Sequence, residues 1–376
     1  PTRGADVGFG KEARETMRSI VLLIATMLFC VPIIAAESPL RQAILDDYHN
    51  ELGALFLHFH QNPELSFREE KTAARLADEL RQSDVEVTEQ VGGTGIVGIL
   101  RNGNGPVVLV RADMDGLPIL ENAGLEYQST ARQVDISGEE VSVMHACGHD
   151  THMTSMVGTA RRLAATRDSW SGTVMFVGQP AEERIGGAKA MLEDGLYERF
   201  GVPDFALAFH VSAGYPAGKL AVDSGLIASS SDSVDITVFG IGAHGASPHR
   251  GKDSVYIASQ IVVALQGIVS REINPLEPGV VTVGSIHGGF KHNIIGDKVE
   301  MQITVRSDDP NIREELLDGI DRVARGVAIS MNVPEDLMPE VIRSETETTP
   351  PTINDPATAQ RLRDAFAARI SDSVLV

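Results

Sequence analysis

The segment MHACGHDTHM, at residues 144–153, concentrates side chains that can carry out chemistry. Within ten positions it holds five of them: His145, Cys147, His149, Asp150 and His152. A cysteine among histidines can be a nucleophile activated by an imidazole, a ligand of a metal ion, or a small buried residue without a chemical role. The segment alone leaves these three interpretations open, so the positions of the other polar residues have to distinguish them.

Carboxylates and a further histidine come shortly after three apolar segments: Asp113 and Asp115 after PVVLV, Glu182 and Glu183 after TVMFVG, and His210 after FALAF. Ligands of open α/β sheets bind outside the carboxyl ends of the strands, so we expect these side chains to meet at one edge of a sheet. Cys147 and His149 immediately precede a predicted helix and join them there. The mixture of thiolate, imidazole and carboxylate predicts a metal site for Zn, Mn, Co or Ni rather than for Ca or Mg.

The adjacent pair Glu182 and Glu183 indicates a division of labour. One carboxylate can bind the metal while the other stays free and takes a proton from a water molecule that the metal activates. Two metal ions that share such a water make a strong nucleophile near neutral pH. The pattern therefore predicts a hydrolase.

Alternating elements predict the fold that positions these residues. The strand-like segments GIVGIL, PVVLV, TVMFVG and DFALAFHV alternate with helical segments at residues 149–165 and 186–196. Ser66 and Glu69 form a capping-box pattern that predicts a helix through KTAARLADELRQ. This alternation predicts an α/β fold with a mixed, largely parallel sheet over residues 37–228.

The pattern changes near residue 229. Strands are predicted in SSSDSVDITVFG, VVTVGSIHGG, KVEMQITVRS and PEVIRSETE, with helices at residues 254–270 and 311–330. This βαββαβ order predicts a second domain at residues 229–349. A Pro- and Thr-rich connector follows, and residues 350–376 are predicted to begin the return to the first domain.

Composition and the N-terminal segment bound the cellular context. The 376 residues carry a formal net charge of -20, which argues against nucleic acid as a partner, because binding a polyanion needs a basic surface. Residues 1–36 are interpreted as an upstream stretch followed by a signal peptide that starts at Met17. We therefore expect a secreted or periplasmic protein. The apolar segment is also long enough for an uncleaved membrane anchor, and a buried helix is the third alternative.

A series of motifs occurs in order along the chain: HQNPELSF, RADMDGLPI, MHACGHDTHM, QPAEE, AFHV, GAHGASPH, ASQIVVALQGIVSREINP and VVTVGSIHGG. On these motifs the chain resembles the M20 family of metallopeptidases, in the branch of aminoacylases, hippurate hydrolases and auxin-conjugate amidohydrolases. The resemblance covers the chain from about residue 45 to the end. The resemblance implies a zinc-exopeptidase-like first domain with two divalent metal ions per subunit. It also implies hydrolysis of the amide bond of N-acyl amino acids or similar small amides.

The resemblance also implies roles for individual residues. Cys147 corresponds to a bridging metal ligand, Glu182 to the general base, and Asp115 to a carboxylate that orients its neighbours. The other metal ligands implied by the family are His149, Glu183 and His210.

The second domain resembles the family's lid and dimerisation domain, which implies a homodimer. There His244 corresponds to a histidine that stabilises the oxyanion in the partner's site. Asn293 and Arg306 correspond to residues that bind the carbonyl and carboxylate of the substrate, and a planar guanidinium suits a carboxylate well.

The family pattern continues past Val376 with a last metal-binding histidine, so the chain is interpreted as C-terminally truncated. We therefore keep two alternatives to the enzyme open: a metal-binding, dimerising protein without activity, and a hydrolase that uses Cys147 as its nucleophile. Gly178, Ala243 and Gly296 differ from the residues usual in the family, but none of the three is a proposed metal ligand.

Overall fold

The computed structural model describes residues 39–370. The predicted signal peptide, with Cys30, lies outside the described residues and stays a prediction. The chain divides into two compact units, at residues 1–51 and 52–376. The described part of the first unit contains α2 (Pro39–Asp47) and the beginning of the π-helix η1 (Tyr48–Leu52). All further elements belong to the second unit.

Five strands form the first sheet, in the order β1-β2-β6-β3-β7. Their bounds are Glu86–Val91 (β1), Gly95–Asn102 (β2), Val107–Asp113 (β3), Gly172–Gln179 (β6) and Phe205–Ala208 (β7). Strand β2 is antiparallel to both of its neighbours, whereas β3 is parallel to β6 and to β7. Four of the five strands therefore run in one direction, and the prediction of a mixed, largely parallel sheet is confirmed.

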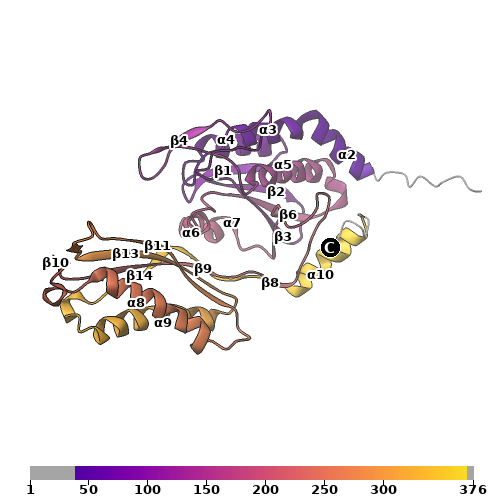
Figure 1. The fold of residues 1–376 in the computed structure, drawn as a ribbon. Helices are drawn as coiled ribbons and strands as arrows, with labels where there is room; N and C mark the ends of the chain where they lie inside the picture. Colours follow the sequence, from indigo (N-terminus) through magenta and orange to yellow (C-terminus); the bar gives the residue numbers. More distant parts are fainter. Residues whose placement is uncertain (1–38, 371–376) are drawn as a thin grey trace, which may run out of the picture. The chain divides into compact units, whose positions relative to one another are not determined.

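Helices cover both faces of this sheet (Figure 1). They are α3 (Gly53–Gln61), α4 (Glu70–Arg81) and α5 (His149–Ala165) on one core, and α6 (Gly187–Glu193) and α7 (Leu196–Phe200) on the other. Residues in β6 alternate between the two cores: Val174 and Phe176 pack on the first, Met175 and Val177 on the second. A strand buried on both faces needs apolar residues throughout, which explains the continuous apolar pattern of TVMFV.

A long connection joins β3 to α5, and its last part lies next to the residues that follow β3. It contains the short hairpin of β4 (Arg132–Val134) and β5 (Glu140–Ser142). Leu117 and Met144 then exchange two backbone hydrogen bonds, of 2.9 and 3.1 Å. These bonds place the start of the MHACGHDTHM segment beside the residues that follow β3.

The capping-box prediction for α4 is wrong. The helix begins at Glu70, and the side chain of Glu69 at the N-cap makes no capping bond. The backbone N–H of Thr72, in the first turn, instead donates a hydrogen bond to the buried Glu64 carboxylate at 2.8 Å. Ser66 and Glu69 are turned away from α4 and bond to residues of the sheet edge.

The second sheet has four antiparallel strands in the order β11-β13-β9-β14. Their bounds are Ser231–Phe239 (β9), Gly279–Gly288 (β11), Lys298–Ser307 (β13) and Glu340–Thr349 (β14). Two helices, α8 (Ser254–Gly267) and α9 (Pro310–Ser330), pack on one face of this sheet around a separate core (Figure 1). The predicted βαββαβ order is present, while the domain boundaries at residues 228/229 and 349/350 stay predictions.

The strands of the second sheet alternate between a buried and an open face. In β13 the side chains of Val299, Met301, Ile303 and Val305 enter the core. The intervening side chains, Arg306 among them, point to the face without helices. The described helical stretch Ser254–Glu272 is long and apolar enough to cross a membrane by composition alone. Its apolar side chains at Ile257, Ile261 and Leu265 are buried in this core, as expected of a core helix.

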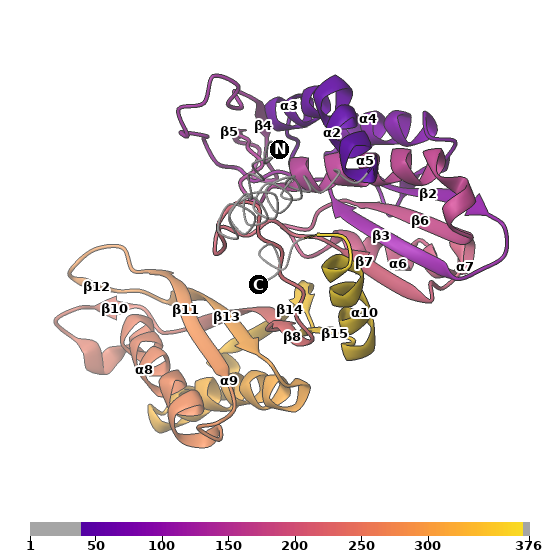
Figure 2. The same cartoon turned by 90° about the vertical axis from the view of Figure 1, so that its right-hand side faces the viewer.

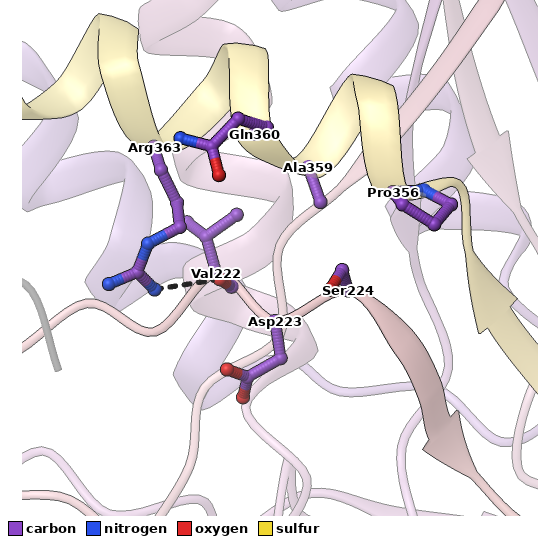
Figure 3. Close-up of a pocket in the computed structure, with 7 residues that line it drawn as sticks. All are labelled: Val222, Asp223, Ser224, Pro356, Ala359, Gln360 and Arg363. Atoms are coloured by element: carbon purple, nitrogen blue, oxygen red, sulfur yellow. Dashed lines mark hydrogen bonds between the residues drawn. The ribbon is translucent and has the colours of Figure 1, made fainter.

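The two connections between the domains pair with each other. Strand β8 (Gly225–Ala228) leads into the second domain, β15 (Thr352–Asn354) leads out of it, and the two are antiparallel (Figure 2). After β15 the chain continues into α10 (Pro356–Ala367), which borders a cleft of about 230 Å³ over residues 222–224 (Figure 3). Arg363 of α10 donates a 2.9 Å hydrogen bond across this cleft to the carbonyl of Val222.

Packing of α8 predicts a test of the second core. Ile261 is fully buried whereas Val263, two residues on, is 68% exposed. Ile261→Ala should lower the free energy of unfolding by about 2–5 kcal/mol, because it leaves a cavity in the core. Val263→Ala should change it by less than about 0.5 kcal/mol. Urea unfolding followed by circular dichroism measures both variants, and equal effects would contradict this packing.

Candidate metal centre

Donor atoms from four segments gather at the carboxyl edge of the first sheet. The Cys147 thiol, a nitrogen of His149 and a carboxylate oxygen of Glu183 lie within 4.8 Å of one another. A second group, which shares His149, consists of Asp113, His149, His152 and His210. The two groups touch, because Cys147 Sγ lies 3.3 Å from His210 Nε2. The structure thus brings together all four predicted metal ligands.

Parallel strands explain why residues so distant in sequence meet here. Strands β3, β6 and β7 end at Asp113, Gln179 and Ala208. Asp113 itself belongs to the cluster, and Glu183 and His210 follow β6 and β7. Helix α5 begins at His149 itself, after Gly148 in a left-handed conformation (φ 79°). A side chain at Gly148 would start 2.4 Å from a methyl carbon of Val211. Only glycine therefore lets this turn approach the strand that delivers His210.

His149 is oriented as metal-binding histidines are. Its Nδ1 donates a 2.7 Å hydrogen bond to the backbone carbonyl of Asp115, which leaves the lone pair on Nε2. Nε2 is buried and has no hydrogen-bond partner in the part of the chain that the structure describes. It lies 3.6 to 3.8 Å from carboxylate oxygens of Asp113, Glu182 and Glu183. A buried acceptor that points into a group of carboxylates fits a cation at this position.

The electrostatics of the cluster also favour a cation. Burial and the neighbouring Glu182 carboxylate raise the pKa of Glu183, and Glu183 Oε1 is buried without a partner. Burial alone would lower the pKa of His149, yet the hydrogen bond to Asp115 and the nearby carboxylates raise it. The carboxylates beside Glu183 and around His149 gather negative charge at this point, and a divalent cation would neutralise it.

The thiol of Cys147 is not activated by these surroundings. Burial, followed by the Glu183 and Glu182 carboxylates, raises its pKa to about 12. A thiol with this pKa stays protonated at neutral pH, so the 3.3 Å contact with His210 does not yield a thiolate. A bound metal would deprotonate it, because a coordinating thiol binds as the thiolate.

Asp113 and His152 belong to the centre and are not among the predicted site residues. His152 Nδ1 donates a 2.6 Å hydrogen bond to Asp113, and its Nε2 accepts one of 2.9 Å from the backbone N–H of Val211. Burial would raise the pKa of Asp113, but His152 and the Arg111 guanidinium hold it below its ordinary value. With both nitrogens engaged, His152 supports the segment that carries His210. The spacing of His149 and His152 on one helix face is the sequence signal for it.

The remaining predicted residue of the first domain, Asp115, is almost completely buried. Its two carboxylate oxygens accept the backbone N–H groups of Glu182 and Glu183 at 3.0 and 3.1 Å, and the hydroxyl of Ser66 at 2.6 Å. Burial raises the pKa of Asp115, but its hydrogen bonds from His149 and Ser66 lower it overall. Asp115 therefore remains ionised and holds the backbone of both glutamates.

Of the residues predicted in the second domain, Arg306 lies beside the cluster. It lines a cleft of about 620 Å³ together with Glu182, Glu183 and Arg111. Its Nη1 is buried and has no hydrogen-bond partner among residues 39–370. A guanidinium with a free N–H group in this cleft is available to a ligand carboxylate.

His244 and Asn293 lie together in another part of the second domain. His244 is in β10 (Ala243–His244), which pairs with β12 (Ile294–Ile295), and Gly245 N donates to the Asn293 carbonyl at 2.9 Å. Neither residue lines the cleft with Arg306. Within residues 39–370, the structure gives no contact between this pair and the donor cluster.

The family model described as "Peptidase family M20/M25/M40" matches residues 109–375. The chain belongs to this family. The M20 chain is 41% identical to thermostable carboxypeptidase 2 of Saccharolobus solfataricus over 272 residues, which cover 71% of the chain and 66% of that relative. It therefore spans about two thirds of that protein's length. A hippurate hydrolase of Campylobacter jejuni is 39% identical over 75% of the chain and 71% of its own length.

A solved structure extends the likeness of the M20 chain to the fold. The Bacillus subtilis YXEP protein, a dinuclear metal-binding peptidase from the M20 family, superposes with a TM-score of 0.69 and 29% identity. The match covers 86% of this chain and 80% of that one. The predicted family and its fold are thereby confirmed. In the M20 chain, the residues that could bind metal are those of the donor cluster described above.

The pKa of Cys147 predicts its reactivity. In metal-free protein at pH 7, iodoacetamide should alkylate Cys147 far more slowly than an ordinary thiol, because almost no thiolate is present. The rate should still be rising at pH 10, where an unperturbed thiol has levelled off. Peptide mapping by mass spectrometry follows Cys147 alone, with Cys147→Ser as the blank. A rate that levels off below pH 9 would contradict the raised pKa.

Proposed function

We propose that this chain is the metal-binding part of an amidohydrolase that cleaves the amide bond of N-acyl amino acids or similar small amides. One observation carries the proposal: His149 Nε2 and Glu183 Oε1, both buried and unpartnered, face each other across 3.8 Å next to the free carboxylate of Glu182. Such an arrangement provides metal ligands and a proton acceptor side by side. Membership of the M20 family and its hippurate hydrolase relative support the same chemistry.

The donor set determines which residues would hold metal. Cys147, His149, Glu183 and His210 are the ligands we propose, for two divalent ions of which Zn or Mn fits the mixed donors best, with Co or Ni also suitable. When bound, such ions supply Lewis-acid chemistry that polarises a carbonyl and activates water. His152 is left out of the ligand set because Asp113 and Val211 occupy both of its nitrogens.

Glu182 is the proposed general base. Its side chain is 37% exposed, against 18% for Glu183, and it lines the cleft that a substrate would enter. It would take a proton from the attacking water and then give it to the leaving amine. Asp115 holds the Glu182 backbone in place, and the free Nη1 of Arg306 would pair with the carboxylate of the amino acid.

A second candidate uses Cys147 as a nucleophile, and its 3.3 Å contact with His210 favours it. The raised pKa of the thiol disfavours it, since burial and two glutamates oppose the thiolate. Metal dependence separates the two mechanisms. A chelator should abolish hydrolysis by a metal enzyme and leave a thiol enzyme active.

The proposed roles of the two glutamates are tested by matched substitutions. Glu182→Gln should lower kcat for an N-acyl amino acid such as hippurate by about 10²–10⁴-fold, the contribution of a general base, while the metal content stays normal. Glu183→Gln should lower the metal content itself. Metal analysis and amide hydrolysis are measured on both variants beside the wild type. Full activity of Glu182→Gln would remove Glu182 from the mechanism.

We propose further that the second domain forms a homodimer in which His244 completes the partner's site. Arg306 is near the end of β13 and lines the cleft beside the metal cluster. His244 pairs with β12, which comes just before the start of β13, so His244 is near the other end of that strand. From Lys298 to Arg306 is eight residue steps, or about 27 Å at the rise of a strand. His244 therefore lies far from the cluster beside Arg306, which supports the proposal that it serves the site of a partner subunit.

Mixed dimers test this arrangement. Glu182→Gln and His244→Ala subunits should each be inactive alone, and their heterodimer should regain one working site, because one subunit supplies the base and the other the histidine. Loss of a single oxyanion donor costs about 10²–10³-fold, so this rescue is easily measured. The mixture is prepared with two affinity tags to isolate the heterodimer. No rescue in that heterodimer would exclude action across subunits.

A further inference from the structure

The loop that carries both glutamates is held by two buried carboxylates. Three consecutive residues of this loop donate their backbone N–H groups to side chains outside it: Ala181, Glu182 and Glu183. Asp115 accepts the second and third, and Glu69 accepts the first at 2.7 Å. Glu69 comes from the HQNPELSF region, whose chemistry the donor cluster does not use.

Glu69 is fully buried, and its carboxylate bonds to the loop, to its own segment and to Thr94 between β1 and β2. Its Oε1 accepts the N–H groups of Ala181 and Phe67, at 2.7 and 3.0 Å. Its Oε2 accepts the hydroxyl of Thr94 at 2.5 Å. Removing a carboxylate from water is costly, and these three donors compensate for the lost hydration and fix the orientation of the side chain.

The backbone that Glu69 holds is strained. Ala181 and Ile185, on either side of the two glutamates, have positive φ angles of 47° and 55°. Residues with a side chain rarely adopt this region, and it persists only where the surroundings enforce it. Glu69 accepts a hydrogen bond from the backbone N–H of Ala181, the first of these two residues.

A side-chain contact locks the two segments together. Phe67 also has a positive φ, of 61°, and its ring lies 2.8 Å from the point where a side chain on Gly186 would begin. Ser66, the preceding residue, bonds to Asp115. The segment 66–69 therefore contacts the loop at Ala181 and at Gly186, on both sides of the two glutamates, and supports its conformation.

From this geometry we infer that Glu69 is a positioning residue for amide hydrolysis: by fixing the backbone of Ala181 it sets the directions of Glu182 and Glu183. The inference rests on the proposed function for its effect on rate. Its effect on metal binding, through Glu183, does not depend on which substrate the protein hydrolyses.

Substitutions separate the two oxygens of Glu69. Glu69→Gln keeps an acceptor for Ala181 and Phe67 on one atom, and its amide can donate to Thr94 on the other, so the loop should be retained. Glu69→Ala removes all three bonds. Thr94→Val removes only the bond to Oε2 and should have a smaller effect in the same direction.

Glu79 provides a matched control. It is also a buried glutamate, 5% exposed and on the same stretch of chain, but its carboxylate bonds to Arg75 and Arg161, outside the donor cluster. Glu79→Ala should lower the melting temperature as Glu69→Ala does. It should leave the metal centre unchanged.

The experiment measures Co²⁺ binding by the thiolate–Co²⁺ absorption of Cys147, and the steady-state hydrolysis of an N-acyl amino acid, on folded full-length chains. Glu69→Ala should bind Co²⁺ about 10–100-fold more weakly, as loss of a supporting partner typically does. Its kcat should fall by about 10²-fold with a smaller change in KM, because a displacement near 1 Å costs that much in rate. Glu69→Gln should restore both values to near those of the wild type.

Each outcome decides the inference. Wild-type Co²⁺ affinity and kcat in Glu69→Ala, or the same losses in Glu79→Ala, would overturn it. If Glu69→Ala does not fold, Thr94→Val decides, and wild-type behaviour in that variant would overturn it. If the wild type hydrolyses no N-acyl amino acid but Glu69→Ala alone loses Co²⁺ affinity, the positioning role stands and only the proposed function falls.

Discussion

The buried carboxylate of Asp115 joins the segments on which the metal centre is built. It accepts the hydroxyl of Ser66 and the backbone N–H groups of Glu182 and Glu183. Its own backbone carbonyl accepts the Nδ1 proton of His149. One residue thus fixes a proposed ligand histidine and the loop with both glutamates at once. A carboxylate buried this deeply stays ionised only because these donors replace water, so its bonds and the geometry of the site depend on each other.

The sequence was sufficient to predict the site where type and strand position coincide. Asp115, Glu183 and His210 each follow an apolar strand, and parallel strands deliver whatever follows them to one edge. Cys147 and His149 required only the start of a helix. The order of the second domain was predictable for a similar reason, since the buried alternation of Val299 to Val305 is a two-residue period.

What the sequence did not predict are contacts that depend on three-dimensional proximity. Ser66 and Glu69 have the spacing of a capping box, but the loop after β6 offers their side chains better partners and Glu64 serves α4 instead. The sequence alone does not distinguish His152 from a metal ligand, whereas in the structure Asp113 and the backbone of Val211 engage both of its ring nitrogens. No local pattern encodes which donors a folded chain will bring to a carboxylate.

The paired strands β8 and β15 bear on how such a chain could have been assembled. Because Ile353 pairs with Leu226 and Asn354 with Gly225, the entrance and exit of the second domain are adjacent in space. A segment whose two ends meet can be gained or lost at a single point of a host fold, since a short turn could close the gap. The two domains can therefore have separate origins. The donor cluster would then come from the first domain and Arg306 from the inserted second domain.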